Sequence, residues 1–98
     1  MKVKIQSIHF DADEKLLNFV EGKVGKLNTF SNAIIDGEVF LRLEKSSSTE
    51  NKIAEIKLLI PGNDLFAKRQ CKTFEEATDQ AIEALRRQLK KQKEKAMP

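Results

Sequence analysis

Residues 34–72 read IIDGEVFLRLEKSSSTENKIAEIKLLIPGNDLFAKRQCK, and apolar and polar side chains alternate along most of this stretch. A period of two is typical of strands with one buried and one solvated face. The pattern predicts strands over 34–45, 54–60 and 65–72. The polar turn at 46–51 and the turn residues Pro61-Gly62-Asn63 separate them, so the three strands are expected to be antiparallel neighbours. The last strand has the most diluted apolar face and is expected at an edge of the sheet.

The same alternation predicts which strand side chains face the core. The expected inward set is Ile35, Val39, Leu41, Leu43, Ala54, Ile56, Leu58, Ile60, Leu65, Ala67 and Cys71. Phe40 and Phe66 have the opposite parity and are expected on the solvated face. There they could form a small patch that a partner or a stacked nucleic-acid base covers.

A strand and a helix are predicted before this stretch. Alternation over 2–9 indicates the strand. Asp11 and Glu14 form a capping-box pattern at the start of a helix over 12–29, although two interior glycines weaken that helix. Its apolar stripe consists of Leu16, Val20, Val24 and Leu27.

A second helix is predicted after the stretch. Thr73 and Glu76 repeat the capping-box pattern, and an apolar stripe at helical spacing continues the helix to at least residue 92. The stripe consists of Phe74, Ala77, Ala81, Leu85 and Leu89.

The order of elements is therefore β-α-β-β-β-α. A strand-helix-strand crossover is right-handed and joins parallel strands. We expect an α+β fold, in which a four-stranded mixed sheet carries two parallel helices on one face. A chain of 98 residues has room for one core, so residues 1–98 are expected to form a single domain.

Composition argues against catalysis and metal binding. The single cysteine, Cys71, excludes an internal disulfide, and with His9 as the only histidine the chain cannot build a thiolate zinc site. His9 lies beside Asp11 and Asp13, and we interpret it as a turn residue. Lys72 could lower the pKa of the neighbouring thiol, but no base can be assigned to activate it. We predict a non-enzymatic protein with no catalytic residue, cofactor, metal or small-molecule substrate.

The location of the protein is inferred from what its sequence lacks. The start MKVKIQSIHF has no long apolar stretch of the kind found in signal peptides, and no segment approaches the roughly 18 apolar residues of a membrane helix. A lone cysteine suits a reducing compartment. We expect a soluble, cytoplasmic protein with no membrane partner.

Positive charge is concentrated near one end of the chain. The net charge is +3, but residues 86–95 alone have a net charge of +5, which leaves −2 for the remainder. The cations of this basic end are Arg86, Arg87, Lys90, Lys91, Lys93 and Lys95. On a helical wheel all of these except Lys95 spread over the side opposite Leu85 and Leu89, where they face solvent.

Three explanations of this charge can be compared. Cations that complement the helix dipole gain only about 0.3–1 kcal/mol each, and five excess charges exceed that need. A membrane surface would require large apolar residues on the same segment, and after Leu89 only Met97 remains. A phosphate backbone would neutralise the cations and release counterions, which favours nucleic-acid binding. If both helices lie on one sheet face, Lys23 and Lys26 come close to the basic end and extend this surface.

Three segments carry a resemblance to a known family. They are IHFDADEKLLNFVEGKVGKL at 8–27, IPGNDLFA at 60–67 and RRQLKKQKEK at 86–95, the last being the most specific. Together with the order of elements, they make nearly the whole chain similar to the ribosome hibernation-promoting factors, also called ribosome-associated inhibitors. The resemblance implies a four-stranded sheet with two helices on one face, loosely similar to double-stranded RNA-binding domains.

The resemblance also implies a partner and a mechanism. Members of this family bind the small ribosomal subunit in its decoding channel, contact ribosomal RNA where messenger and transfer RNA would lie, and inhibit translation in stationary phase and under stress. By position, the resemblance assigns rRNA binding to Lys23, Lys26, Arg87, Lys90, Lys91 and Lys95. Arg86 and Lys93 join the set on the wheel argument alone.

Two features of the chain qualify the resemblance. Thr73, Phe74 and Glu75 stand where many members have an acidic residue, methionine and tyrosine, so no tyrosine-dependent contact is implied. The ending at Pro98 implies a short form, which is expected to favour ribosome dimers and to be monomeric off the ribosome. A general double-stranded RNA-binding module not dedicated to the ribosome remains the alternative function.

Overall fold

The computed structural model describes residues 1–45 and 49–96, with side chains described as far as Gln92. The elements in chain order are β1 (Lys2–Ile8), α1 (Glu14–Gly25), α2 (Leu27–Phe30), β2 (Asp36–Leu43), β3 (Lys52–Ile60), β4 (Asn63–Cys71) and α3 (Phe74–Ala96). The predicted order is confirmed, except that the expected first helix is divided in two. Ser46 to Ser48, the first part of the predicted polar turn, lie outside the described residues.

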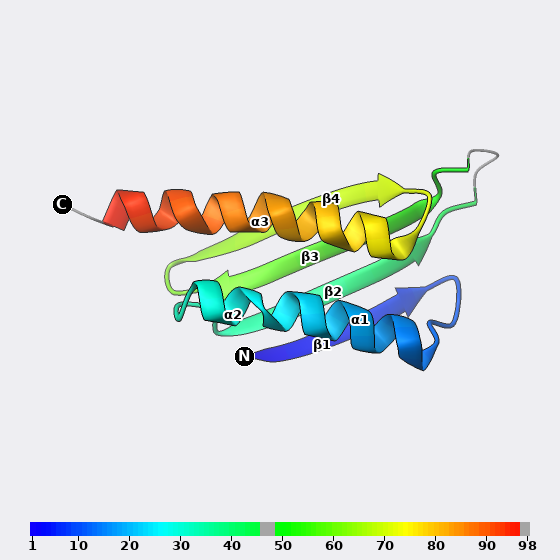
Figure 1. Cartoon of the computed structure of the whole chain (residues 1–98), viewed down its shortest axis with the longest axis horizontal. Helices are drawn as coiled ribbons and strands as arrows, with labels where there is room; N and C mark the ends of the chain where they lie inside the picture. The colour runs from blue at the N-terminus through cyan, green and yellow to red at the C-terminus, as the bar shows by residue number, and fades with distance from the viewer. Residues whose placement is uncertain (46–48, 97–98) are drawn as a thin grey trace.

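The sheet has the strand order β1-β2-β3-β4. β1 and β2 are parallel, with Ile5 opposite Val39, and the pairs β2-β3 and β3-β4 are antiparallel. Both α1 and α3 cover the same face of the sheet and run in the same direction (Figure 1). The predicted α+β fold is therefore confirmed, including the edge position of β4.

The core lies between the sheet and the helices, and it follows the predicted parity with one shift. Val39, Leu41, Ala54, Ile56 and Leu58 are fully buried, as expected from the period of two. The shift concerns two isoleucines at the start of β2. The structure corrects the placement of Ile35, which is 50% exposed, whereas Ile34 is buried. The reason is that β2 begins only at Asp36, so Ile35 precedes the strand and does not share its alternation.

The start of α1 differs from the prediction by two residues. Asp13, and not Asp11, is the N-cap, because its Oδ1 accepts a hydrogen bond of 2.8 Å from the backbone N–H of Leu16. His9 has a φ of 69°, in the left-handed region, which confirms that it is a turn residue. The chain after this turn is not helical up to Asp13, although the capping-box pattern predicted a helix from residue 12.

The break between α1 and α2 occurs at Lys26. The Lys26 carbonyl accepts hydrogen bonds from the backbone N–H of Thr29 at 3.1 Å and from its hydroxyl at 2.7 Å. These bonds to a residue three positions later are of the tighter 3₁₀ type. The break directly follows Gly22 and Gly25, residues with low helix propensity.

Helix α3 begins as predicted and passes beyond the body of the domain. The Thr73 hydroxyl accepts a hydrogen bond of 3.1 Å from the backbone N–H of Glu76. Leu89 is the last buried residue of the described part of α3, and Lys90, Lys91 and Gln92 are exposed. The final turns of the helix project past the start of β4 (Figure 1). The basic end is therefore presented to solvent.

The pKa of the Cys71 thiol is raised, and not lowered by the neighbouring Lys72. Burial of Cys71 in the core raises the pKa of its thiol, the Glu76 and Glu50 carboxylates raise that pKa further, and Arg69 lowers it. Because the raised pKa belongs to the folded state, the unfolded chain releases this proton first as the pH increases. The contribution of the protonated thiol to the free energy of unfolding is fully present below the ordinary thiol pKa of about 8.5. It is lost as the pH rises through the folded-state pKa.

We therefore expect the free energy of unfolding to fall above about pH 8.5 in the wild type but less in Cys71→Ala. Urea unfolding of both proteins from pH 7 to pH 10 measures the difference. Curves that remain parallel over this range would contradict the assigned shift.

Candidate nucleic-acid interface

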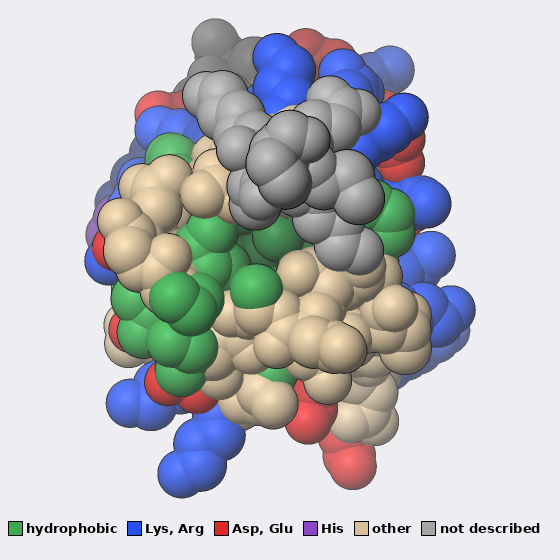
Figure 2. Space-filling view, turned by 90° about the vertical axis from the view of Figure 1, so that its left-hand side faces the viewer, with side chains coloured by type: hydrophobic (Ala, Val, Ile, Leu, Met, Phe, Trp, Pro, Cys, Tyr) green, Lys and Arg blue, Asp and Glu red, His purple; other side chains and the backbone are tan. Residues whose placement is uncertain are grey.

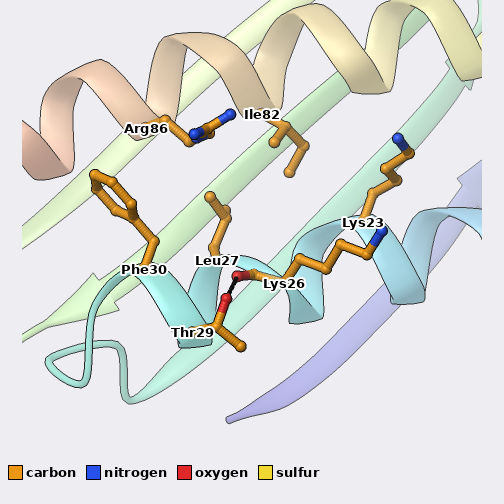
Figure 3. A pocket seen from close by; sticks show the side chains of 7 residues that line it. All are labelled: Lys23, Lys26, Leu27, Thr29, Phe30, Ile82 and Arg86. Carbon is orange, nitrogen blue, oxygen red and sulfur yellow. Dashed lines mark hydrogen bonds between the residues drawn. The ribbon is translucent and has the colours of Figure 1, made fainter.

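The ends of the two helical segments meet above one end of the sheet. Lys23 of α1 and Lys26 at the helix break lie opposite Arg86 of α3, and the three line a hollow of about 390 Å³ (Figure 3). The predicted closeness of the first helix to the basic end is therefore confirmed. It follows from the parallel course of α1 and α3, which brings both C-terminal ends to the same side of the domain.

A second hollow adjoins the first along α3. It measures about 530 Å³ and is lined by Phe30, Glu83, Arg86, Arg87 and Lys90. Phe30 and Arg86 line both hollows and so form the wall between them. Together the two adjoining hollows, which we call the track, are lined by five of the predicted cations: Lys23, Lys26, Arg86, Arg87 and Lys90.

The cations of this track differ in whether they already have an acidic partner. Lys23 pairs with Asp79 at 3.4 Å, and Arg86 pairs with Glu83 at 3.7 Å. Of the described cations that line the track or lie beside it on α3, four are exposed and form no ion pair with a described residue: Lys26, Arg87, Lys90 and Lys91. These four are the ones whose charge is fully available to a polyanion.

The two acidic partners were not predicted from the sequence. Glu83 and Arg86 are three residues apart on one helix, a spacing at which side chains meet, so the sequence does contain a signal for that pair. Asp79 and Lys23 belong to different helices, and only the packing of α1 on α3 brings them together. Both acids lower the positive potential of the track.

Two phenylalanines beside the cations were also missed. The Arg86 guanidinium lies 5.7 Å from the centre of the Phe30 ring, and the Lys23 ammonium lies 5.5 Å from that of Phe19. Both distances are in the range of cation–π attraction. Phe19 and Lys23 are four residues apart on one helix, a spacing from which their contact could be predicted. Phe30 and Arg86 are distant in the sequence, so their contact could not.

The solvated face of the sheet has no comparable excess of charge. Three of its cations pair with acids across neighbouring strands, namely Arg42 with Glu55 at 3.1 Å, Lys68 with Glu55 at 3.7 Å and Lys57 with Asp64 at 3.5 Å. The exposed Lys2 and Lys4 of β1 form no ion pair with a described residue, but Asp36 and Glu38 lie opposite them on β2. From the end at which both helices finish, Lys and Arg side chains line one flank, whereas the other flank shows hydrophobic side chains together with further Lys and Arg side chains (Figure 2). A phosphate-rich partner is therefore better accommodated on the helical side.

The two exposed aromatics of the sheet do not form one platform. Phe66 is 51% exposed and Phe40 is half-buried, so their predicted face is confirmed. However, Phe40 lies on β2 opposite Glu55, and Phe66 lies on β4 opposite Lys57. Strand β3 separates the rings, which corrects the expectation of a single small patch.

The side chains of two predicted site residues are not described. Lys93 and Lys95 are in the last turns of α3, and their side chains fall outside the described residues.

Among the described residues, no group of three or more His, Cys, Asp and Glu side chains could hold a metal ion. No described helix combines the length and the apolar character needed to span a membrane.

Comparison with known proteins gives consistent matches over nearly the whole chain. The sequence model of the family described as "Sigma 54 modulation protein / S30EA ribosomal protein" matches residues 3–97. Two relatives from Pseudomonas putida, both named ribosome hibernation promoting factor, are each 30% identical to the chain over 95 residues. The matched region covers 97% of this chain and 89% of each relative.

Solved structures show the same fold at lower sequence identity. A ribosomal subunit interface protein from Coxiella burnetii superposes with a TM-score of 0.84 at 19% identity, covering 95% of this chain and 98% of that one. The N-terminal domain of Protein Y from Thermus thermophilus superposes with a TM-score of 0.73 at 21% identity, covering 92% and 93%. At these identities the likeness establishes the architecture only.

Proposed function

The chain belongs to the Sigma 54 modulation protein / S30EA ribosomal protein family, and we propose that it is a ribosome hibernation factor. In this proposal the protein binds the small ribosomal subunit in its decoding channel and blocks messenger and transfer RNA. It acts by occupying the channel and catalyses no reaction. The observation that carries the proposal is the meeting of Lys23, Lys26 and Arg86 at one hollow beside the basic end.

Electrostatics explains how such a surface would bind ribosomal RNA. Cations that contact phosphates release condensed counterions, which supplies affinity without reading sequence. The proposed contacts are Lys23, Lys26, Arg86, Arg87, Lys90, Lys91, Lys93 and Lys95. Because phosphate contacts carry no base information, selectivity for the channel must come from the shape of the RNA around it. The projecting end of α3 is suited to entering a confined, RNA-lined space.

We also propose that the protein favours ribosome dimers and is monomeric off the ribosome. The names of the Pseudomonas putida relatives support a promoting role in hibernation, and the chain matches 89% of their length. Sucrose-gradient profiles of ribosomes with and without added protein would detect dimers. A profile in which the protein travels with single ribosomes only, at saturating protein, would contradict this part of the proposal.

The main test is competition with the ligands of the channel. We expect small subunits preloaded with messenger and transfer RNA to bind the protein more than about tenfold more weakly than empty subunits, because both occupants require the same phosphates. The logarithm of the affinity should fall with the logarithm of salt concentration with a slope of about −3 to −4, or steeper, if the four unpaired cations each contact a phosphate. Simultaneous binding of protein and messenger RNA without loss of affinity would contradict the proposal.

A general double-stranded RNA-binding module is the second candidate. The architecture favours it, since two parallel helices on one sheet face present cations at a common end. Duplex RNA is recognised mostly by its shape and backbone, which suits a surface rich in Lys and Arg. Equal affinity for a bare RNA duplex and for small subunits, measured at the same salt concentration, would favour this module over a dedicated hibernation factor.

A further inference from the structure

We propose that the hollow between α1, α2 and α3 holds one unstacked nucleotide of single-stranded RNA. Its base lies against Phe30 and Arg86, and its phosphate is bound by Lys23 and Lys26. The inference rests on the proposed function and specifies which form of RNA the helical side recognises, namely a single strand and not a continuous duplex.

The hollow has an apolar floor and cations around it, and a nucleotide is a ligand that requires both. Leu27, which is 2% exposed, and the partly buried Ile82 form an apolar floor, with Phe30 at one end (Figure 3). Cations from two helices stand around this floor. A phosphate backbone alone does not need an apolar floor, and a purely apolar ligand does not need cations. A nucleotide has a flat, largely apolar base and an anionic phosphate, and so matches both.

The dimensions of the hollow suit a single nucleotide. Its volume of about 390 Å³ lies at the lower end of the roughly 300–1,000 Å³ typical of small-molecule sites. A base paired within a duplex is held in the stack and reaches such a hollow only after it is extruded. A nucleotide in a single strand enters without that cost.

Phe30 and Arg86 provide a surface on which a base can stack. The guanidinium carbon of Arg86 lies 5.7 Å from the centre of the Phe30 ring, so the two planar groups are already held together. Bases in single-stranded RNA commonly stack on aromatic rings and on arginine planes. The same two residues border the second hollow, where Arg87 and Lys90 could bind the following phosphates of the strand.

The acidic partners hold the rim cations in place and limit what can enter. Asp79 lies 3.4 Å from Lys23, and Glu83 lies 3.7 Å from Arg86, in pairs whose side chains are all at least 39% exposed. Such exposed pairs are weak, so a phosphate can replace the carboxylate as the partner of Lys23. The remaining negative charge repels additional phosphates, which favours one nucleotide over several closely spaced ones.

The test compares two ten-unit strands that differ only in their bases. One is oligouridine and the other is an abasic ribose-phosphate strand with the same number of phosphates, both followed by fluorescence anisotropy. We expect the intact wild-type chain to bind oligouridine about 5- to 150-fold more tightly than the abasic strand, the range measured for removal of stacking contacts. Arg86→Lys, which keeps the charge but loses the plane, should reduce this ratio toward one.

A second variant and a matched control keep the test independent of folding. Phe30→Leu should also reduce the ratio, whereas Phe19→Leu, which removes the ring under Lys23 outside the hollow, should leave it unchanged. An unchanged ratio in both Arg86→Lys and Phe30→Leu would overturn the nucleotide site. Displacement of oligouridine by an equal concentration of uridine 5′-monophosphate would overturn it as well, because the ligand would then be a free nucleotide.

The failure of this site and the failure of the proposed function give different results. If the wild type co-sediments with small subunits but binds both strands equally, only the nucleotide site is wrong. If it neither co-sediments nor binds either strand, the proposed function falls together with the inference.

Discussion

The triple variant R87E/K90E/K91E is expected to lose co-sedimentation with small ribosomal subunits at physiological salt while it remains folded. All three side chains are exposed and form no ion pair with a described residue, so their reversal breaks no described ion pair. Each reversal removes an attraction to phosphate and adds a repulsion. Like charges brought together at an interface cost several kcal/mol, which corresponds to an affinity loss of more than about 100-fold.

A charge-matched control separates a local effect from one of net charge. K15E/K45E/K72E changes the charge by the same amount at the opposite end of the domain, where α1 and α3 begin and β2 ends (Figure 1). We expect this control to bind subunits within a few-fold of the wild type, with far-ultraviolet circular dichroism confirming the helices of both variants. Equal losses in the two triple variants would show that only overall charge matters and that the basic end is not the interface.

The strands of the sheet could be predicted because the alternation that marks each strand lies within that strand's own residues. Each of the strands β2, β3 and β4 carries its own period of two, and the turn at Pro61-Gly62-Asn63 fixes how two of them pair. The errors occurred at ends of elements. The helix start moved from Asp11 to Asp13, and the core position moved from Ile35 to Ile34, because a turn or a strand began later than the residue pattern alone indicates.

The site was predictable only in part, for the same reason. The cations of α3 repeat at helical spacing, and the parallel course of the helices placed Lys23 and Lys26 beside them. The contact of Phe30 with Arg86 joins residues far apart in the chain. A repeating pattern in the sequence cannot predict such a contact, because the contact is created by the way two helices pack on one sheet. The hollow itself could therefore be found only in three dimensions.

Leu85→Ala is expected to produce the largest loss of stability among conservative truncations near the site. Leu85 is fully buried in the core, one residue before Arg86. Truncation of a buried leucine to alanine lowers the free energy of unfolding by about 2–5 kcal/mol, because apolar burial is lost and a cavity remains. Domains of this size have a total free energy of unfolding of about 5–15 kcal/mol. The melting temperature should therefore fall by at least about 8 °C.

Leu59→Ala provides the matched control, because it removes the same atoms from a side chain that is 41% exposed on the solvated face of the sheet. Its effect should stay below about 1 kcal/mol. Urea unfolding measures both variants, and a shifted midpoint with an unchanged slope indicates a true stability change. Below its melting temperature, Leu85→Ala should still bind small subunits within a few-fold of the wild type, because every cation is retained. Equal stabilities of the two variants would contradict the packing of α3 on the sheet, and with it the position of the basic end beside Lys23 and Lys26.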